Sequence, residues 1–192
     1  YVAGVGGMGI NVVSAILATA GMKQGYDVRF TNKKGLAIRN GSVYSHVLFA
    51  RPGVMISPII PYGKADLLIG LDILEAVRGL NPAGNLRVGS PRHTAAAVNT
   101  AKTPTTTVLM GRDDFDPAEL EEMLKAHTRG GSYFGQNLSA ISERYLGHKV
   151  YANLILLGAA YQKGLLPLDE ASLLWAIRVN LKPDEVAPNL RA

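Results

Sequence analysis

The first fifty residues carry apolar patterns of changing period, which predict a strand, a helix and two further strands. A short apolar run at residues 1–3 predicts the first strand. Residues 8–24 place their apolar side chains on one broad stripe with helical spacing, and Gly25 ends that pattern. A strand at 26–30 follows. Residues 43–49 alternate, with odd positions on one face and even positions on the other, which predicts a strand.

The middle of the chain predicts a buried strand followed by a helix. A continuous apolar run at 65–71 is typical of a strand covered on both faces of a parallel sheet. Asp72 is placed to cap a short helix through Arg78. A turn then leads to a predicted strand at 86–89. Residues 54–60, with Pro58 and the following Pro61, are expected to form an edge strand or an extended loop, and residues 99–104 are expected to be irregular.

The last third of the chain is predicted to be mainly helical. Asp116 before Pro117 marks a helix start, and that helix extends to about His127. A short strand at 132–134 precedes the final helices. These patterns predict an α/β fold, with a Rossmann-like, mostly parallel sheet flanked by helices and a helical C-terminal end. The final helices are expected at 138–146, 150–163 and 169–180, within a single domain over 1–192 that has its sheet core at about 1–135 and its helical end at about 136–192.

Composition narrows the possible function classes. The chain has no cysteine, which rules out a disulfide framework, a thiolate-bound iron–sulfur cluster and a cysteine nucleophile in it, and a cytoplasmic setting fits. Charged residues make up 18%, below the roughly 25% of an average domain, so we expect part of the surface to be covered by partners. The net charge of +5 is scattered, which argues against nucleic-acid binding, and no apolar stretch is long enough to span a bilayer.

A G-x-G-x-x-G motif at residues 4–9 follows the first strand and opens the first helix. Such glycines permit close approach of the backbone and leave helix N–H groups free to face an anion. The candidate cofactor-binding residues are therefore Gly4, Gly6, Gly7 and Gly9. The structural alternative is a set of glycines that permit only a tight turn and close contact between helix and strand.

A second glycine-rich segment, 33–43, stands where an NAD-binding domain would carry an acid. Arg39 lies between Gly35 and Gly41, and its planar guanidinium can bind a phosphate or a carboxylate. Either the segment binds a ligand, or it is a hairpin-like turn with a solvated arginine, or the lysines meet the 2′-phosphate of NADP. The residues concerned are Arg39, Asn40, Gly41 and Ser42 for the ligand, with Lys33 and Lys34 for NADP.

No catalytic or metal-binding set emerges from the remaining polar residues. His46 lies in a predicted strand and is expected to be a hydrogen-bonded sheet histidine. The other histidines lack metal-ligand spacing and are expected at the surface or at helix caps. The acids between 113 and 122 are explained by the helix that starts there, since acids stabilise a helix N-terminus. Asp72 is expected to cap rather than to catalyse.

Several different short motifs are distributed along nearly the whole chain. They lie at 4–9, 35–43, 45–47, 57–61, 65–68, 74–76, 98–100, 153–159 and Asn189. In this order and spacing they resemble the gamma subunit of 2-oxoacid:acceptor oxidoreductases. The smaller subunit of the indolepyruvate-type enzymes is most similar, and it is equivalent to domain III of pyruvate:ferredoxin oxidoreductase. That family's second loop usually reads Gly-x-Ala-Gln-Arg-Gly-Gly-Ser, so Ile38 and Asn40 are departures, whereas Arg39 is kept.

The resemblance implies a subunit of an enzyme rather than an enzyme by itself. Such complexes oxidatively decarboxylate a 2-oxoacid to acyl-CoA, with thiamine diphosphate and iron–sulfur clusters on partner chains. The indolepyruvate-type resemblance implies an aryl-substituted 2-oxoacid as the expected substrate. The gamma-type subunit is expected to help seat CoA and to assemble the complex, with Arg39 as its main side chain. The alternatives are an independent NADP-binding oxidoreductase domain and a purely structural adaptor.

Overall fold

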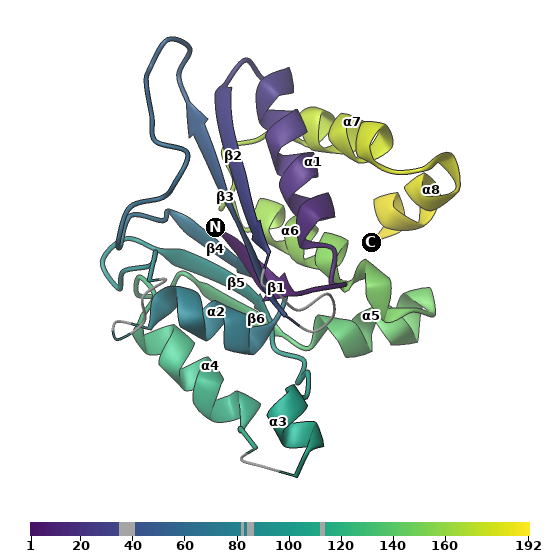
Figure 1. Ribbon diagram of the computed structural model, residues 1–192. Coiled ribbons are helices and arrows are strands. Elements are labelled where there is room, and N and C mark those ends of the chain that lie inside the picture. Colours follow the sequence, from purple (N-terminus) through teal and green to yellow (C-terminus); the bar gives the residue numbers. More distant parts are fainter. Residues whose placement is uncertain (35–40, 82, 84–86, 112–113) are drawn as a thin grey trace.

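The computed structural model describes residues 1–34, 41–81, 83, 87–111 and 114–192, which form one mixed sheet between two layers of helices (Figure 1). Four strands, β1, β4, β5 and β6, are mutually parallel, and β3 pairs antiparallel with both β1 and β2. The strand order is β2-β3-β1-β4-β5-β6. The strands are β1 Val2–Val5, β2 Asp27–Lys34, β3 Ser42–Ala50, β4 Leu67–Gly70, β5 Ala95–Asn99 and β6 Tyr133–Gln136.

Helices cover both faces of this sheet (Figure 1). α1 and α6 pack on one face, and α7 packs against α1. α2 packs on the opposite face with α4 beside it. The helices are α1 Ile10–Lys23, α2 Ile73–Leu80, α3 Thr106–Leu109, α4 Pro117–Ala126, α5 Leu138–Leu146, the 3₁₀ helix η1 Lys149–Tyr151, α6 Ala152–Gln162, α7 Glu170–Asn180 and α8 Pro183–Arg191.

Two hydrophobic clusters hold these layers together, one on each face of the sheet. Ile16 of α1 and Leu156 of α6 are fully buried in the first, and Leu68 of β4 is fully buried in the second. Burial of each such side chain stabilises the fold by about 1.5–3 kcal/mol. Because α6 and α7 contribute to the same cluster as α1, the C-terminal helices form part of the core. Within the described residues, no helix has the length and apolar character needed to cross a membrane.

The α/β fold predicted from the sequence is confirmed, including the mostly parallel sheet and the helical C-terminal end. The strand expected at 86–89 is wrong over its described residues, 87–89. Val88 instead lies in a loop, where its N–H donates to Gly79 O (2.9 Å) and its carbonyl accepts from Ala65 N (2.9 Å). The strand in this part of the sheet is β5. Its Ala-Ala-Ala-Val-Asn sequence has little strand propensity, but it is wholly buried, with helices packed on both sides.

The second glycine-rich segment joins β2 and β3, which pair as an antiparallel hairpin with Lys34 opposite Val43. β2 is longer than expected and extends through Lys34. In the sheet, β3 lies between β2 and β1. A dinucleotide-binding fold would instead place its second strand directly beside the first. Helices α3 and α8 were not predicted from the sequence.

Candidate functional site

The two glycine-rich segments meet at the carboxyl edge of the parallel strands. The Gly6 N–H donates to the carbonyl of Gly41 (2.9 Å), which ties the first loop to the start of β3. Gly4 lies inside β1, where an added Cβ would come within 3.1 Å of Leu71 Cβ. A ligand crevice in an open α/β sheet is expected at this edge, because the carboxyl ends of parallel strands meet there.

Gly7 and Gly9 differ in what surrounds them, although both have positive φ, at 99° and 83°. A Cβ on Gly9 would overlap the side-chain amide of Asn153, which approaches from α6. A Cβ on Gly7 would meet nothing within 4 Å, and this residue is exposed. Gly9 therefore serves close packing between loop and helix, whereas the backbone at Gly7 remains accessible. Gly9 is also the N-cap of α1 and offers no side-chain cap.

The described end of the second segment is held by a buried acid. Ser42 Oγ donates to Glu75 Oε2 (2.6 Å), and Arg78 Nη1 donates to Glu75 Oε1 (2.5 Å). Glu75 is 6% exposed. These contacts fix the start of β3 to α2 at the site edge. Two predicted site residues, Arg39 and Asn40, lie outside the described residues.

A second buried acid, Asp72, lies one turn before Glu75. Its Oδ1 accepts from the N–H groups of Leu74 (3.0 Å) and Glu75 (3.1 Å), so the predicted cap is confirmed. Its carboxyl also has a hydrogen bond with the side chain of Thr103. Burial raises the pKa of Asp72, and burial likewise raises the pKa of Glu75. Two neighbouring buried carboxyls with raised pKa therefore lie at the start of α2.

The position where an NAD-binding domain would carry an acid is occupied by a structural amide. Asn32 accepts a hydrogen bond from Ser45 Oγ and donates to Asn11 Oδ1 (3.1 Å). These contacts join β2, β3 and α1. Because the amide is used in this way, Asn32 does not replace the carboxylate that holds a ribose hydroxyl in an NAD-binding domain.

A crevice of about 660 Å³ opens at the carboxyl edge, between the first glycine loop and the segments after β5 and β6. Asn99 bridges its floor, because its Oδ1 accepts from Leu138 N (2.9 Å) and its Nδ2 donates to Ser139 Oγ (3.0 Å). Two cations line the crevice, Lys102 and Lys149. The lining includes Gly7, Met8, Asn99, Lys102, Thr103, Asn137, Ser139, Glu143, His148, Lys149 and Asn153.

Most of these lining residues were missed in the sequence. The available signal was the asparagine that directly follows the core of each of two parallel strands, Asn99 and Asn137. Lys102 pairs with Asp114 (2.7 Å) and Lys149 with Glu143 (3.6 Å), both at exposed or half-exposed positions. Such pairs are worth about 0–1 kcal/mol, so either lysine can exchange its partner for an anionic ligand.

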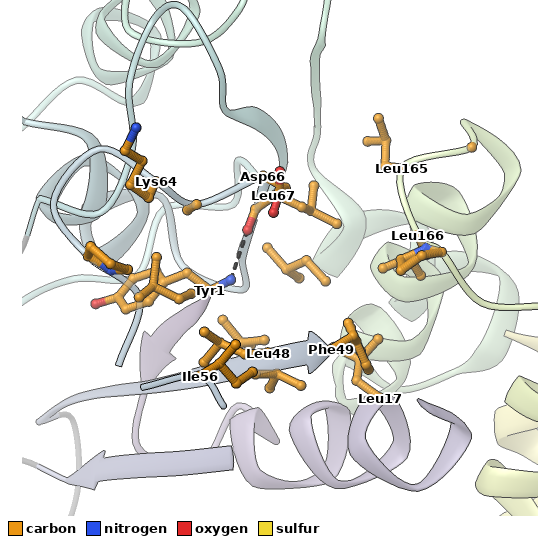
Figure 2. A pocket seen from close by; sticks show the side chains of 18 residues that line it. Tyr1, Leu17, Leu48, Phe49, Ile56, Lys64, Asp66, Leu67, Leu165 and Leu166 are labelled. Atoms are coloured by element: carbon orange, nitrogen blue, oxygen red, sulfur yellow. Dashed lines mark hydrogen bonds between the residues drawn. The ribbon is translucent and has the colours of Figure 1, made fainter. Parts of the chain in front are cut away.

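Another cavity, of about 550 Å³, lies at the opposite, amino end of β1 and β4. Figure 2 shows its mostly apolar walls, with Leu48 and Phe49 from β3, Leu17 from α1, and Leu165 and Leu166 from the segment after α6. Among the described residues that line it, Lys64 and Asp66 carry the charged side chains. It thus offers few groups for recognition or chemistry.

The histidines behave as expected from the sequence. His46 Nδ1 accepts the N–H of Ile60 (3.1 Å), and burial lowers the pKa of His46 to about 4. His93 pairs with Asp66 at the surface, and His127 and His148 bond backbone groups at helix ends. Within the part of the chain that the structure describes, no group of three or more potential ligands could hold a metal ion.

Comparison with known proteins identifies the family. The family model described as pyruvate ferredoxin/flavodoxin oxidoreductase matches residues 1–192. The chain belongs to this family. Three curated relatives, each indolepyruvate oxidoreductase subunit IorB, are aligned over all of the chain. They come from Methanothermobacter thermautotrophicus (33% identical, 92% of the relative covered), Archaeoglobus fulgidus (31%, 89%) and Thermococcus kodakarensis (28%, 90%).

Three solved structures share the fold of this chain. The pyruvate oxidoreductase subunit PORC from Thermotoga maritima matches with a TM-score of 0.63 and 18% identity, over 99% of this chain and 89% of that one. A keto/oxoacid ferredoxin oxidoreductase gamma subunit from Geobacter sulfurreducens gives 0.61 and 16%, over 99% and 90%. The 2-oxoglutarate:ferredoxin oxidoreductase from Magnetococcus marinus, with 2-oxoglutarate, coenzyme A and succinyl-CoA bound, gives 0.65 and 18%. Here 99% of this chain matches 28% of the larger one.

Proposed function

We propose that the chain is the gamma-type small subunit of a complex that oxidatively decarboxylates a 2-oxoacid, including aryl-substituted ones, to acyl-CoA. In this reaction a 2-oxoacid and CoA give acyl-CoA, carbon dioxide, one proton and two electrons for an external acceptor. The observation that carries the proposal is the alignment of the whole chain with indolepyruvate oxidoreductase subunits at up to 33% identity. The chain supplies no catalytic residue of its own.

Partner chains would bind thiamine diphosphate and the iron–sulfur clusters. The absence of cysteine supports this division, because thiolates are the usual cluster ligands. Exposed apolar side chains also support assembly of the chain into a complex. Met55, Leu109, Met110 and Tyr145 are each at least 69% exposed, and large apolar side chains in this state favour burial against another subunit.

The carboxyl-edge crevice is the proposed seat for the phosphates of CoA. Gly7 leaves its backbone accessible there, and Lys102 and Lys149 line the crevice with replaceable ion-pair partners. Phosphate is bound well by lysine charges and by free N–H groups near a helix N-terminus. The loop residues proposed to complete the seat are Gly4, Gly6, Gly9, Arg39, Asn40, Gly41 and Ser42.

The test uses the assembled complex carrying Lys102→Ala or Lys149→Ala. Each variant is expected to raise KM for CoA by about tenfold while KM for the 2-oxoacid changes little, as one charge-assisted contact is lost. Lys125→Ala is the matched control, because Lys125 lies on α4 and pairs with Glu121 and Glu122 away from the crevice. Unchanged KM for CoA in both crevice variants would exclude this seat.

Arg39→Ala addresses the second loop separately. We expect weaker use of CoA or weaker docking of the subunit, read as KM for CoA and as the fraction of subunit in the complex on size exclusion. A variant complex that assembles and turns over like wild type would exclude a role for Arg39. An independent NADP-binding domain is disfavoured, since the relatives aligned along the whole chain are subunits of oxoacid oxidoreductases.

A further inference from the structure

A separate pocket of about 380 Å³ lies on the face of the sheet formed by β2 and β3, away from the carboxyl-edge crevice. It is built because α2 packs on β1, β4 and β5, which leaves the neighbouring part of that face to the segment after β3. Ile60 of that segment closes the pocket by donating its N–H to His46 Nδ1 (3.1 Å). Its lining includes Tyr1, Lys33, Tyr44, His46, Tyr62 and Arg87.

One wall of this pocket is aromatic. The Tyr1 and His46 rings are 5.2 Å apart, and the Tyr44 and His46 rings are 5.7 Å apart, both in edge-to-face contact. Tyr62 lies at the rim beneath the guanidinium of Arg87, whose Cζ is 5.5 Å from the ring centroid. Aromatic side chains that line a pocket can pack against a further flat ring in the same edge-to-face or stacked geometries.

The charged side chains among the described lining residues of the pocket are cations. Lys33 of β2 and Arg87 line it, and none of its described lining residues carries a carboxylate. Arg87 Nε donates to Gly89 O (3.1 Å), which anchors the guanidinium, and among the described residues no hydrogen bond engages its two Nη groups. His46 Nδ1 accepts the N–H of Ile60, so the proton of the neutral ring is on Nε2.

We propose that this pocket binds a small aromatic carboxylate, with its ring against the aromatic wall and its carboxylate on the Arg87 fork. The planar guanidinium matches a carboxylate in bidentate geometry. The volume suits a one- or two-ring acid rather than a whole nucleotide cofactor. The site lies apart from the proposed CoA seat, so it stands or falls independently of that seat.

The test is calorimetry on the purified full chain with indole-3-acetate as probe, since this acid carries a ring and a carboxylate but no 2-oxo group. Indole and acetate are titrated separately, to supply the ring alone and the charge alone. Adenosine 3′,5′-bisphosphate tests a nucleotide ligand. Arg87→Ala removes the fork, Arg87→Lys keeps its charge, and Lys33→Gln removes the other cation at the exposed β2 position. Arg92→Ala is the matched control, because Arg92 is exposed and does not line the pocket.

We expect indole-3-acetate to bind wild type at least tenfold more tightly than indole or acetate does. Arg87→Ala should weaken its binding at least tenfold, with Arg87→Lys in between, and Lys33→Gln should weaken it several-fold. Arg92→Ala should leave binding unchanged. The proposal would be overturned if indole-3-acetate did not bind wild type. It would also be overturned if Arg87→Ala and Lys33→Gln both bound indole-3-acetate as tightly as wild type does. Tighter, Arg87-dependent binding of the bisphosphate would also overturn it, since the pocket would then be a nucleotide site.

Discussion

Replacement of Gly9 by alanine tests whether the first glycine loop is shaped by packing against α6. Gly9 has φ 83°, a conformation that costs an L-residue about 1–2 kcal/mol. The added Cβ would also overlap the Asn153 amide. Displacement of a packed side chain costs about 1–3 kcal/mol. The expected total loss in unfolding free energy is therefore about 2–5 kcal/mol.

Gly7→Ala is the matched control within the same loop. Gly7 also has positive φ, but an added Cβ meets nothing within 4 Å, so only the backbone cost of about 1–2 kcal/mol should appear. A third variant, Asn153→Ala, removes the amide that the new Cβ would strike. In that background Gly9→Ala should cost only the backbone term, which gives a coupling of about 1–3 kcal/mol between the two positions.

Urea denaturation, followed by circular dichroism and by tryptophan fluorescence, measures these differences at fixed pH. Coincident transitions by the two probes would justify two-state free energies. The reasoning is refuted if Gly9→Ala is no less stable than Gly7→Ala, or if Asn153→Ala leaves the cost of Gly9→Ala unchanged. Either result would mean that Gly9 is not in contact with α6.

Three further predictions concern the buried polar groups. Ser42→Ala should reduce unfolding free energy by about 1–3 kcal/mol, because Glu75 loses a donor while buried, and urea denaturation at pH 7 measures this. Burial raises the pKa of Glu75 above its usual 4.5. The contribution of Glu75 to the unfolding free energy is therefore fully present below pH 4.5 and is lost as pH rises through the raised pKa. Glu75→Gln should flatten that loss in urea denaturation measured at a series of pH values above 4.5. Burial lowers the pKa of His46 from 6.5 to about 4, so its contribution is present above pH 6.5 and is lost as pH falls towards 4; His46→Gln should flatten that loss, and an unchanged slope would contradict the assignment.

The periodic elements could be predicted from the sequence because their side chains face two different layers. The alternation of residues 43–49 places Val43 and Val47 with one hydrophobic cluster and Tyr44 and Leu48 with the other, as expected. β5 could not be predicted in this way, since a run of alanines has no period and is a strand only because both faces are covered. The antiparallel placement of β3 was equally hidden, because strand order depends on long-range pairing.

The candidate site was predicted in part. The first glycine loop is at the carboxyl edge as the motif indicates, and Asp72 is the expected cap. The packing role of Gly9 depends on Asn153, which is distant in the sequence and carries no local signal. The crevice lysines were missed for the same reason, since the fold alone brings Lys102 and Lys149 to the glycine loop. Whether Arg39 contacts a ligand stays a prediction.

Co-purification of the natively expressed protein tests the central claim most directly. We expect the chain to elute with partner subunits, and native mass spectrometry to find thiamine diphosphate and iron–sulfur clusters on those partners. The same fraction should oxidise an aryl 2-oxoacid in a reaction that depends on CoA. A stable monomer that binds NADPH tightly and has no such partner would contradict the account.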